Sequence, residues 1–150
     1  MLGQLDEYKA IPWQYAATLT FTNKALRKLK SGRLDDPSHL AVDYLRQIAT
    51  KMHLRIGAIS VCVWDNTEVR PHIHMVLIGY TGRSNRTLAD CDPNQLEKGW
   101  PYGSALIAPV NDIDGALNYL ELNERTGGNG FNLHGQRLLQ KLLLSNEMAA

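Results

Sequence analysis

The sequence predicts an α+β fold with a central antiparallel β-sheet and helices packed on it. Two apolar runs, residues 56–64 and 72–79, are separated by a short polar segment, as expected for neighbouring antiparallel buried strands. Other segments alternate between strand-like and helix-like patterns along the chain. Because 150 residues support one hydrophobic core, residues 1–150 are predicted to form a single domain.

The flanking elements are predicted from the same patterns in chain order. A first strand is expected over residues 13–23, which alternate small, β-branched and aromatic residues, and a helix follows from Lys24. The segment from Asp35 to Ser38 has the acidic cap and early proline of a helix start, and apolar residues then recur at helical spacing as far as Met52. The remaining predictions are a short helix at 94–98, a strand at 104–110, a helix at 112–123, a glycine-rich break at 127–130 and a last helix at 133–147.

The composition is that of a globular protein, with 44% hydrophobic and 21% charged residues. Sixteen Lys and Arg against fifteen Asp and Glu give a net charge of +1, which argues neither for nor against a nucleic-acid partner. Two cysteines are too few for a disulfide framework or a thiolate zinc site. No signal peptide and no run of about 20 apolar residues is recognisable, so a cytoplasmic protein without a membrane partner is expected.

Two histidines separated by one residue carry the clearest chemical signal. In a strand, His72 and His74 would lie on one face about 6.6 Å apart along the chain, so both imidazoles could reach one metal ion. Ile73 would then point to the opposite face, which helices must cover, and the other face would display the imidazoles. A half-exposed strand with two histidines of no ligand role has the same spacing, so the motif alone leaves both interpretations open.

Further motifs accompany the histidine segment RPHIHMVLIG. TLTF occupies residues 18–21, GWPYGSALIAPVND follows the histidines, and Tyr119 lies in the helical segment ALNYLELN. In this order the motifs resemble the HUH endonuclease superfamily, which comprises rolling-circle replication initiators, relaxases and related single-strand transposases. The resemblance covers residues 15 to about 123, counted along the printed sequence.

The resemblance implies a divalent metal, Mn²⁺ or Mg²⁺, held by His72, His74 and a third ligand, with Tyr119 attacking a DNA phosphodiester. A phenol has an ordinary pKa near 10, so it needs a metal or a base to act as a nucleophile at neutral pH. Tyr80, at a strand end, and Tyr102, in a loop, are weaker candidates. Leu122 stands where initiators of this family commonly carry a lysine, so this helix lacks that phosphate-positioning group.

The third metal ligand is predicted to be Asp65. Pro71 is suited to the first position of a strand, which suggests a wide loop before it and places Asp65 roughly opposite His72. With a tighter turn, Glu68 or Asn123 would become the candidate. Asp65 could also be a turn residue that bonds its own backbone.

A cluster of cations without acids predicts a nucleic-acid contact. Lys24, Arg27, Lys28 and Arg33 lie within one short segment, and such a patch suits phosphates. A solvated helix face with no partner gives the same pattern.

Taken together, the sequence predicts a metal-dependent tyrosine endonuclease that nicks and rejoins single-stranded DNA through a 5′-phosphotyrosine, initiating rolling-circle replication of a plasmid or phage. Single-stranded DNA or a hairpin origin would be its substrate, and a separate host helicase its partner, since GxxxxGK[ST] is absent. Alternatives are a relaxase or transposase with the same chemistry, a non-catalytic nucleic-acid-binding domain, and a metal-dependent hydrolase that uses water.

Overall fold

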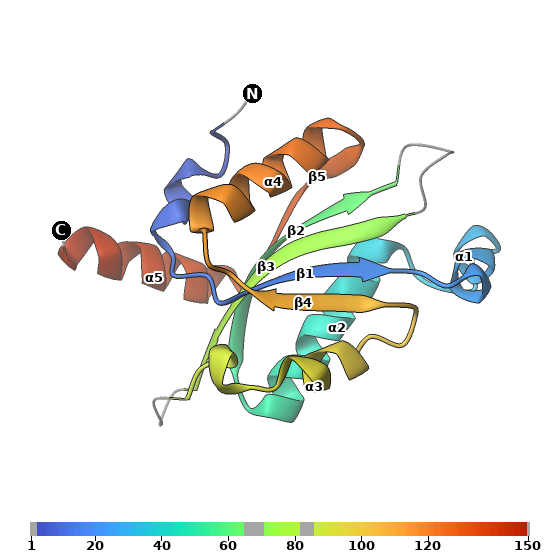
Figure 1. Cartoon of the computed structure of the whole chain (residues 1–150), viewed down its shortest axis with the longest axis horizontal. Helices are drawn as coiled ribbons and strands as arrows, with labels where there is room; N and C mark the ends of the chain where they lie inside the picture. The colour runs from blue at the N-terminus through green and yellow to red at the C-terminus, as the bar shows by residue number, and fades with distance from the viewer. Residues whose placement is uncertain (1–2, 65–70, 82–85, 150) are drawn as a thin grey trace.

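The computed structural model describes residues 3–64, 71–81 and 86–149 and contains a five-stranded antiparallel sheet of order β4-β1-β3-β2-β5 (Figure 1). This confirms the predicted α+β class with a central antiparallel sheet. The strands are β1 (Tyr15–Thr20), β2 (Arg55–Val63), β3 (His72–Tyr80), β4 (Ala105–Pro109) and β5 (Gly128–His134). The helices are η1 (Asp6–Ala10), α1 (Asn23–Lys30), α2 (Pro37–Met52), η2 (Leu88–Asp90), α3 (Pro93–Lys98), α4 (Ile113–Arg125) and α5 (Gln136–Ala149). None of the described helices is long and apolar enough to cross a bilayer.

The middle strand of the sheet is β3, which pairs with β1 on one side and β2 on the other. Its odd-numbered residues, including Ile73 and Met75, are buried in a core with α2 and α3. Its even-numbered residues Val76 and Ile78 are buried in a second core with α4, α5 and η1 on the opposite face. Figure 1 shows these two sets of helices on the two sides of the sheet.

The face that carries the histidines is therefore only partly open. The helices α4 and α5 cover its β2–β3 half, which the sequence prediction of one packed and one displayed face did not include. On the β1–β4 half, Thr18 and Thr20 are half-buried and Leu106 is 70% exposed. The face is covered on one half and open on the other because α4, which follows the edge strand β4, crosses back over the centre of the sheet (Figure 1).

One strand was not predicted. Of residues 127–130, expected to be a glycine-rich break, 128–130 form the start of β5, which pairs with β2 through an irregularity between Val61 and Val63. A Cβ on Gly128 would clash with the backbone of Glu124 and with the side chain of Val61. A glycine is therefore required here because the end of α4 packs closely against the sheet, and close approach of another backbone is one reason for glycine within a strand.

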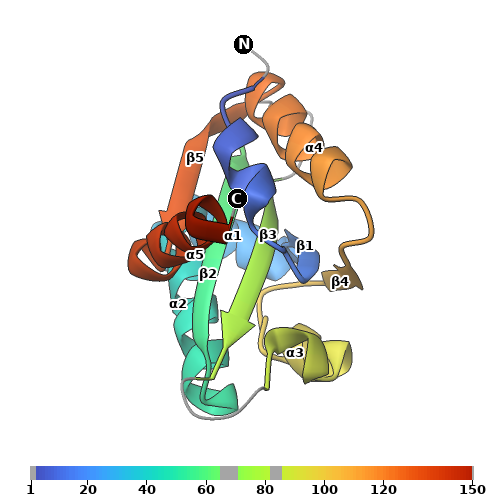
Figure 2. The same cartoon turned by 90° about the vertical axis from the view of Figure 1, so that its left-hand side faces the viewer.

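The position of α4 is fixed by a buried carboxylate. Glu121 is 2% exposed and accepts hydrogen bonds from the backbone N–H groups of Gly3 and Leu5, at 2.9 and 2.7 Å. The following 3-10 helix, η1, contacts both α4 and α5 (Figure 2). Leu117 and Leu120 bury the same side of α4 in the second core. The N-terminal segment therefore holds α4 against the sheet.

Replacing the buried carboxylate should loosen this arrangement. We expect Glu121→Ala to lower the free energy of unfolding by about 2 kcal/mol, because two charge-assisted hydrogen bonds are lost and their N–H donors lose their partner. Urea denaturation measures the change. Glu124→Gln, on the same helix, serves as the control and should change stability by less than about 0.5 kcal/mol; equal losses in the two variants would contradict the anchoring role.

Candidate functional site

Two imidazoles lie side by side at the start of β3. The ring centroids of His72 and His74 are 4.8 Å apart and their planes are 88° from parallel. His74 is 6% exposed, and His72 is half-buried. The register places Thr20 and Val63 opposite His72, and Thr18 and Val61 opposite His74.

The His74 ring is oriented by β1. Its Nδ1 lies 3.2 Å from the hydroxyl oxygen of Thr18, so this hydrogen bond occupies one ring nitrogen and leaves Nε2 for a ligand. Burial, and then the charge of neighbouring His72, lower the pKa of His74 to about 4. The ring is therefore neutral at pH 7, which is the form that binds metals.

Tyr119 reaches this pair from α4. Its ring centroid is 5.2 Å from that of His74, with an angle of 81° between the planes. The side chain is 54% exposed, whereas Leu117 and Leu120 on the same helix are buried. Tyr119 thus lies at the margin of the buried side of α4, where its ring contacts His74 and is still accessible to solvent.

The other two tyrosines considered above lie elsewhere. Tyr80 is six residues from His74 on the same strand, about 20 Å away at about 3.3 Å per residue. Tyr102 precedes β4 and contacts Trp100, with ring centroids 5.0 Å apart. Of these three tyrosines, Tyr119 is the one with a ring contact to the histidine pair.

A cleft of about 450 Å³ opens beside His72. Hydroxyl groups dominate its polar lining, and the sequence analysis did not single them out. Thr20 Oγ1 accepts a hydrogen bond from Ser104 N at 3.1 Å and donates to Ser104 O at 3.3 Å, which joins the ends of β1 and β4. The lining residues are Thr18, Thr20, Phe21, Thr22, Pro71, His72, Gly103 and Ser104. Alternating threonines in TLTF, on the histidine face of an adjacent strand, are the signal that could have identified this wall.

The separation of the two histidine rings matches the one expected for two imidazoles that bind one divalent metal. With metal–nitrogen bonds of about 2.1 Å, an ion would lie about 3.2 Å from each ring centre, and a ligand angle of about 100° would separate the centres by about 4.9 Å. The observed separation is 4.8 Å. In the tautomer that leaves Nε2 free for a metal, Nδ1–H of His74 donates to Thr18 Oγ1, and such a bond from the second ring nitrogen orients a metal-ligating imidazole.

The remaining ligands are not given by the described residues. Within residues 3–64, 71–81 and 86–149, no group of three or more His, Cys, Asp or Glu side chains is arranged to hold a metal. Asp65 and Glu68 lie outside the described residues. The described residue of β2 that pairs with His72 is Val63, and Asp65 as the third ligand stays a prediction. Asn123 donates its amide N–H to the carbonyl oxygen of Tyr119 at 2.9 Å, within α4.

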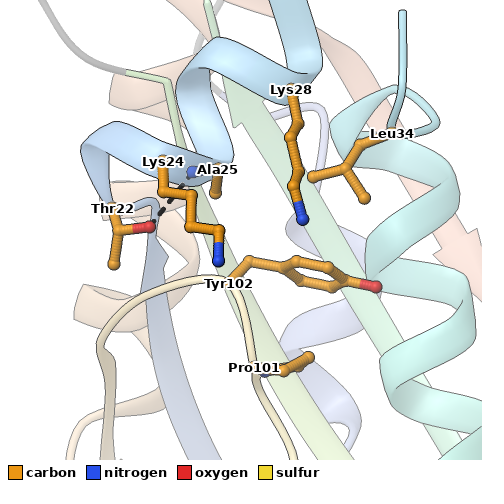
Figure 3. A pocket seen from close by; sticks show the side chains of 7 residues that line it. All are labelled: Thr22, Lys24, Ala25, Lys28, Leu34, Pro101 and Tyr102. Atoms are coloured by element: carbon orange, nitrogen blue, oxygen red, sulfur yellow. Dashed lines mark hydrogen bonds between the residues drawn. The ribbon is translucent and has the colours of Figure 1, made fainter.

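The predicted basic patch is divided by the structure. Lys24 and Lys28 line a pocket of about 270 Å³ together with Tyr102, and their ammonium groups extend toward its ring (Figure 3). Arg27 and Arg33 are exposed and do not line this pocket. The pocket adjoins the cleft beside His72, because Thr22 lines both.

Comparisons with protein-family models, with curated proteins and with solved structures found no match to this chain.

The buried, neutral His74 should make stability depend on pH. Its folded pKa of about 4 lies below the unfolded value of about 6.5, so the unfolded chain binds more protons between these values. The free energy of unfolding should therefore fall as pH decreases from 6.5, with His74 contributing about 2 kcal/mol by pH 5.

Urea denaturation at pH 7 and pH 5 compares the wild type with His74→Gln, which should lose less stability between the two values. His134, whose pKa is also lowered by burial, is present in both proteins and cancels from the difference. Equal losses would mean that His74 is protonated in the folded protein near its ordinary pKa.

Proposed function

We propose that this protein is a metal-dependent tyrosine endonuclease that nicks and rejoins single-stranded DNA. The observation that supports this most strongly is the contact of Tyr119 with His74, beside His72. These residues come from a helix and a strand far apart in sequence, and they are the residues that the HUH-like motifs nominate. The half-exposed phenol and the adjoining cleft leave room for a strand to approach.

The reaction is an in-line substitution at phosphorus. The oxygen of Tyr119 forms a bond to the scissile phosphorus while the bond from phosphorus to the 3′-oxygen breaks. The phenolic proton leaves to solvent, and the departing 3′-oxygen takes up a proton. The products are a 5′-phosphotyrosine and a free 3′-hydroxyl, which can later reverse the step and release the tyrosine.

His72 and His74 would hold the metal, which supplies positive charge to neutralise the phosphate and lower the barrier to attack. Thr18 fixes the orientation of His74, and burial keeps that ring neutral. The hydrophobic anchoring of α4 holds Tyr119 near the histidines, so little conformational freedom is lost before attack.

The biological role that fits this chemistry best is initiation of rolling-circle replication of a plasmid or phage, at a single-stranded or hairpin origin, with a separate helicase. A relaxase or a single-strand transposase would use the same residues. All three assignments follow from the motif resemblance and share the nicking reaction.

Removing one oxygen atom tests the nucleophile. We expect Tyr119→Phe to form no covalent adduct with a labelled single-stranded oligonucleotide in the presence of Mn²⁺, a loss of at least about 1,000-fold, because the attacking oxygen is absent. Binding of the oligonucleotide should stay within about threefold of wild type. A denaturing gel measures the adduct, and anisotropy measures the binding.

Tyr80→Phe is the matched control, since it removes the same atom at the far end of β3 and should leave adduct formation unchanged. Tryptic digestion should place the adduct on the peptide 99–125, which contains both Tyr102 and Tyr119, and fragmentation should assign it to Tyr119. Cleavage without any adduct would support a water-using hydrolase, and binding without cleavage a non-catalytic domain. Either result would overturn the proposal.

The metal ligands can be tested without activity. His72→Gln and His74→Gln should each weaken Mn²⁺ binding at least tenfold in calorimetric titration, because each removes one ligand nitrogen and leaves a side chain of similar size. If Asp65 is the third ligand, Asp65→Ala should weaken binding far more than Asn123→Ala. Near-normal Mn²⁺ affinity in the double histidine variant would contradict the metal site.

A further inference from the structure

A second pocket lies between α1 and the segment that precedes β4. It is lined by Thr22, Lys24, Ala25, Lys28, Leu34, Pro101 and Tyr102 (Figure 3). Its volume of about 270 Å³ is just below the usual range for small-ligand sites, which suits one flat group. Two cations, one aromatic ring and three apolar side chains thus face a single small space.

The aromatic wall of this pocket is held firmly. Tyr102 packs edge-to-face against Trp100, whose indole N–H donates to the carbonyl oxygen of Thr20 at 2.8 Å. The carbonyl of Tyr102 accepts a hydrogen bond from Thr22 N at 2.8 Å. A Cβ on Gly103 would clash with the carbonyl oxygen of Thr20, so only glycine lets the chain approach β1 this closely. The ring of Tyr102 is therefore placed before any ligand arrives.

The cationic wall comes from one turn of α1. Lys24 and Lys28 are four residues apart, so they lie on the same side of the helix. Both are exposed residues, and Figure 3 shows their ammonium groups directed toward the Tyr102 ring. The α1 segment Asn23–Lys30 contains no acidic residue. Positive charge beside a fixed aromatic ring is the arrangement by which proteins bind single-stranded nucleic acids.

The pocket adjoins the cleft beside His72. Thr22 lines both this pocket and the cleft that contains His72, and Thr20 and Ser104 connect the same ends of β1 and β4. A strand whose phosphate lies near His72 could thus pass along the cleft and place a nearby nucleotide over Tyr102.

We infer that this pocket is a nucleotide-binding subsite of the same DNA strand, in which a base stacks on Tyr102 and its phosphates contact Lys24 and Lys28. The inference rests on the proposed function for the identity of the ligand. The DNA strand would thus be bound, outside the cleft beside His72, by α1 and by the segment before β4. Tyr102 would bind a base and take no part in the chemical step.

The test measures binding in the full chain carrying Tyr119→Phe, so that no cleavage occurs. The probes are a labelled oligothymidylate of about 20 nucleotides, which exceeds one site, and an abasic strand with the same number of phosphates. Tyr102→Leu should weaken binding of the oligothymidylate about 5- to 50-fold and leave binding of the abasic strand within about twofold. Tyr102→Phe should retain wild-type binding of both probes, because it keeps the ring.

The lysines should act on both probes. Lys24→Gln with Lys28→Gln should weaken binding of either strand and reduce the slope of log K against log salt by about 1.4, since each lost phosphate contact contributes about 0.7 on single strands. Lys30→Gln with Lys51→Gln removes the same charge from exposed positions outside the pocket and should leave the slope nearly unchanged.

The inference is overturned if Tyr102→Leu weakens both probes equally or neither, or if the two double-lysine variants have the same effect. Thermal unfolding of each variant excludes a loss of fold. Adduct formation by the chain with an intact Tyr119 is measured separately, so failure of this subsite leaves the nicking reaction standing. Absence of both adduct and strand binding would refute the nicking reaction and the subsite together.

Discussion

The register between β1 and β3 is the constraint on which the candidate site depends. It sets Thr18 opposite His74 and Thr20 opposite His72, so the hydroxyls and imidazoles share one face of the sheet. A shift of one residue would turn both histidines toward the core with α2 and α3 and move Ile73 and Met75 to the face that carries the site. Two polar rings would then lie among the apolar side chains of that core. The packing of β3 therefore favours the register that also assembles the site.

The second requirement is the placement of α4. Its buried side, with Leu117 and Leu120, packs against the β2–β3 half of the sheet, while α4 leaves the β1–β4 half uncovered. Tyr119 falls at the boundary between these halves. A position deeper in the interface would exclude a strand from the phenol, and a position further out would lose contact with His74. Glu121, bonded to the N-terminal backbone, holds the helix at this boundary.

The sequence predicts those parts of the fold and the candidate site whose pattern lies within one short segment of the chain. The histidine strand, its neighbour and the α4 segment have period-2 or helical patterns, and each occurs within a few residues of the predicted bounds. The strand β5 was missed because Gly128 and Gly130 resemble a chain break, whereas Gly128 is required by contact with Val61. The cleft wall was missed because Thr20 and Ser104 meet only through pairing of distant strands. The third-ligand prediction for Asp65 lies outside the described residues.

The nearly neutral net charge is uninformative until the fold shows where the cations lie. A net charge of +1 supplies no long-range attraction for a polyanion, so the proposed DNA binding would depend on where cations gather. Of the cationic segment beginning at Lys24, the side chains of Lys24 and Lys28 meet Tyr102, a residue far away in sequence, whereas Arg27 and Arg33 do not line that pocket. Charge alone would bind any polyanion and be screened by salt within about 10 Å at 0.1 M. In the proposed subsite, a fixed ring beside the cations would add a preference for strands whose bases are unpaired, because paired bases are not free to stack on a side chain.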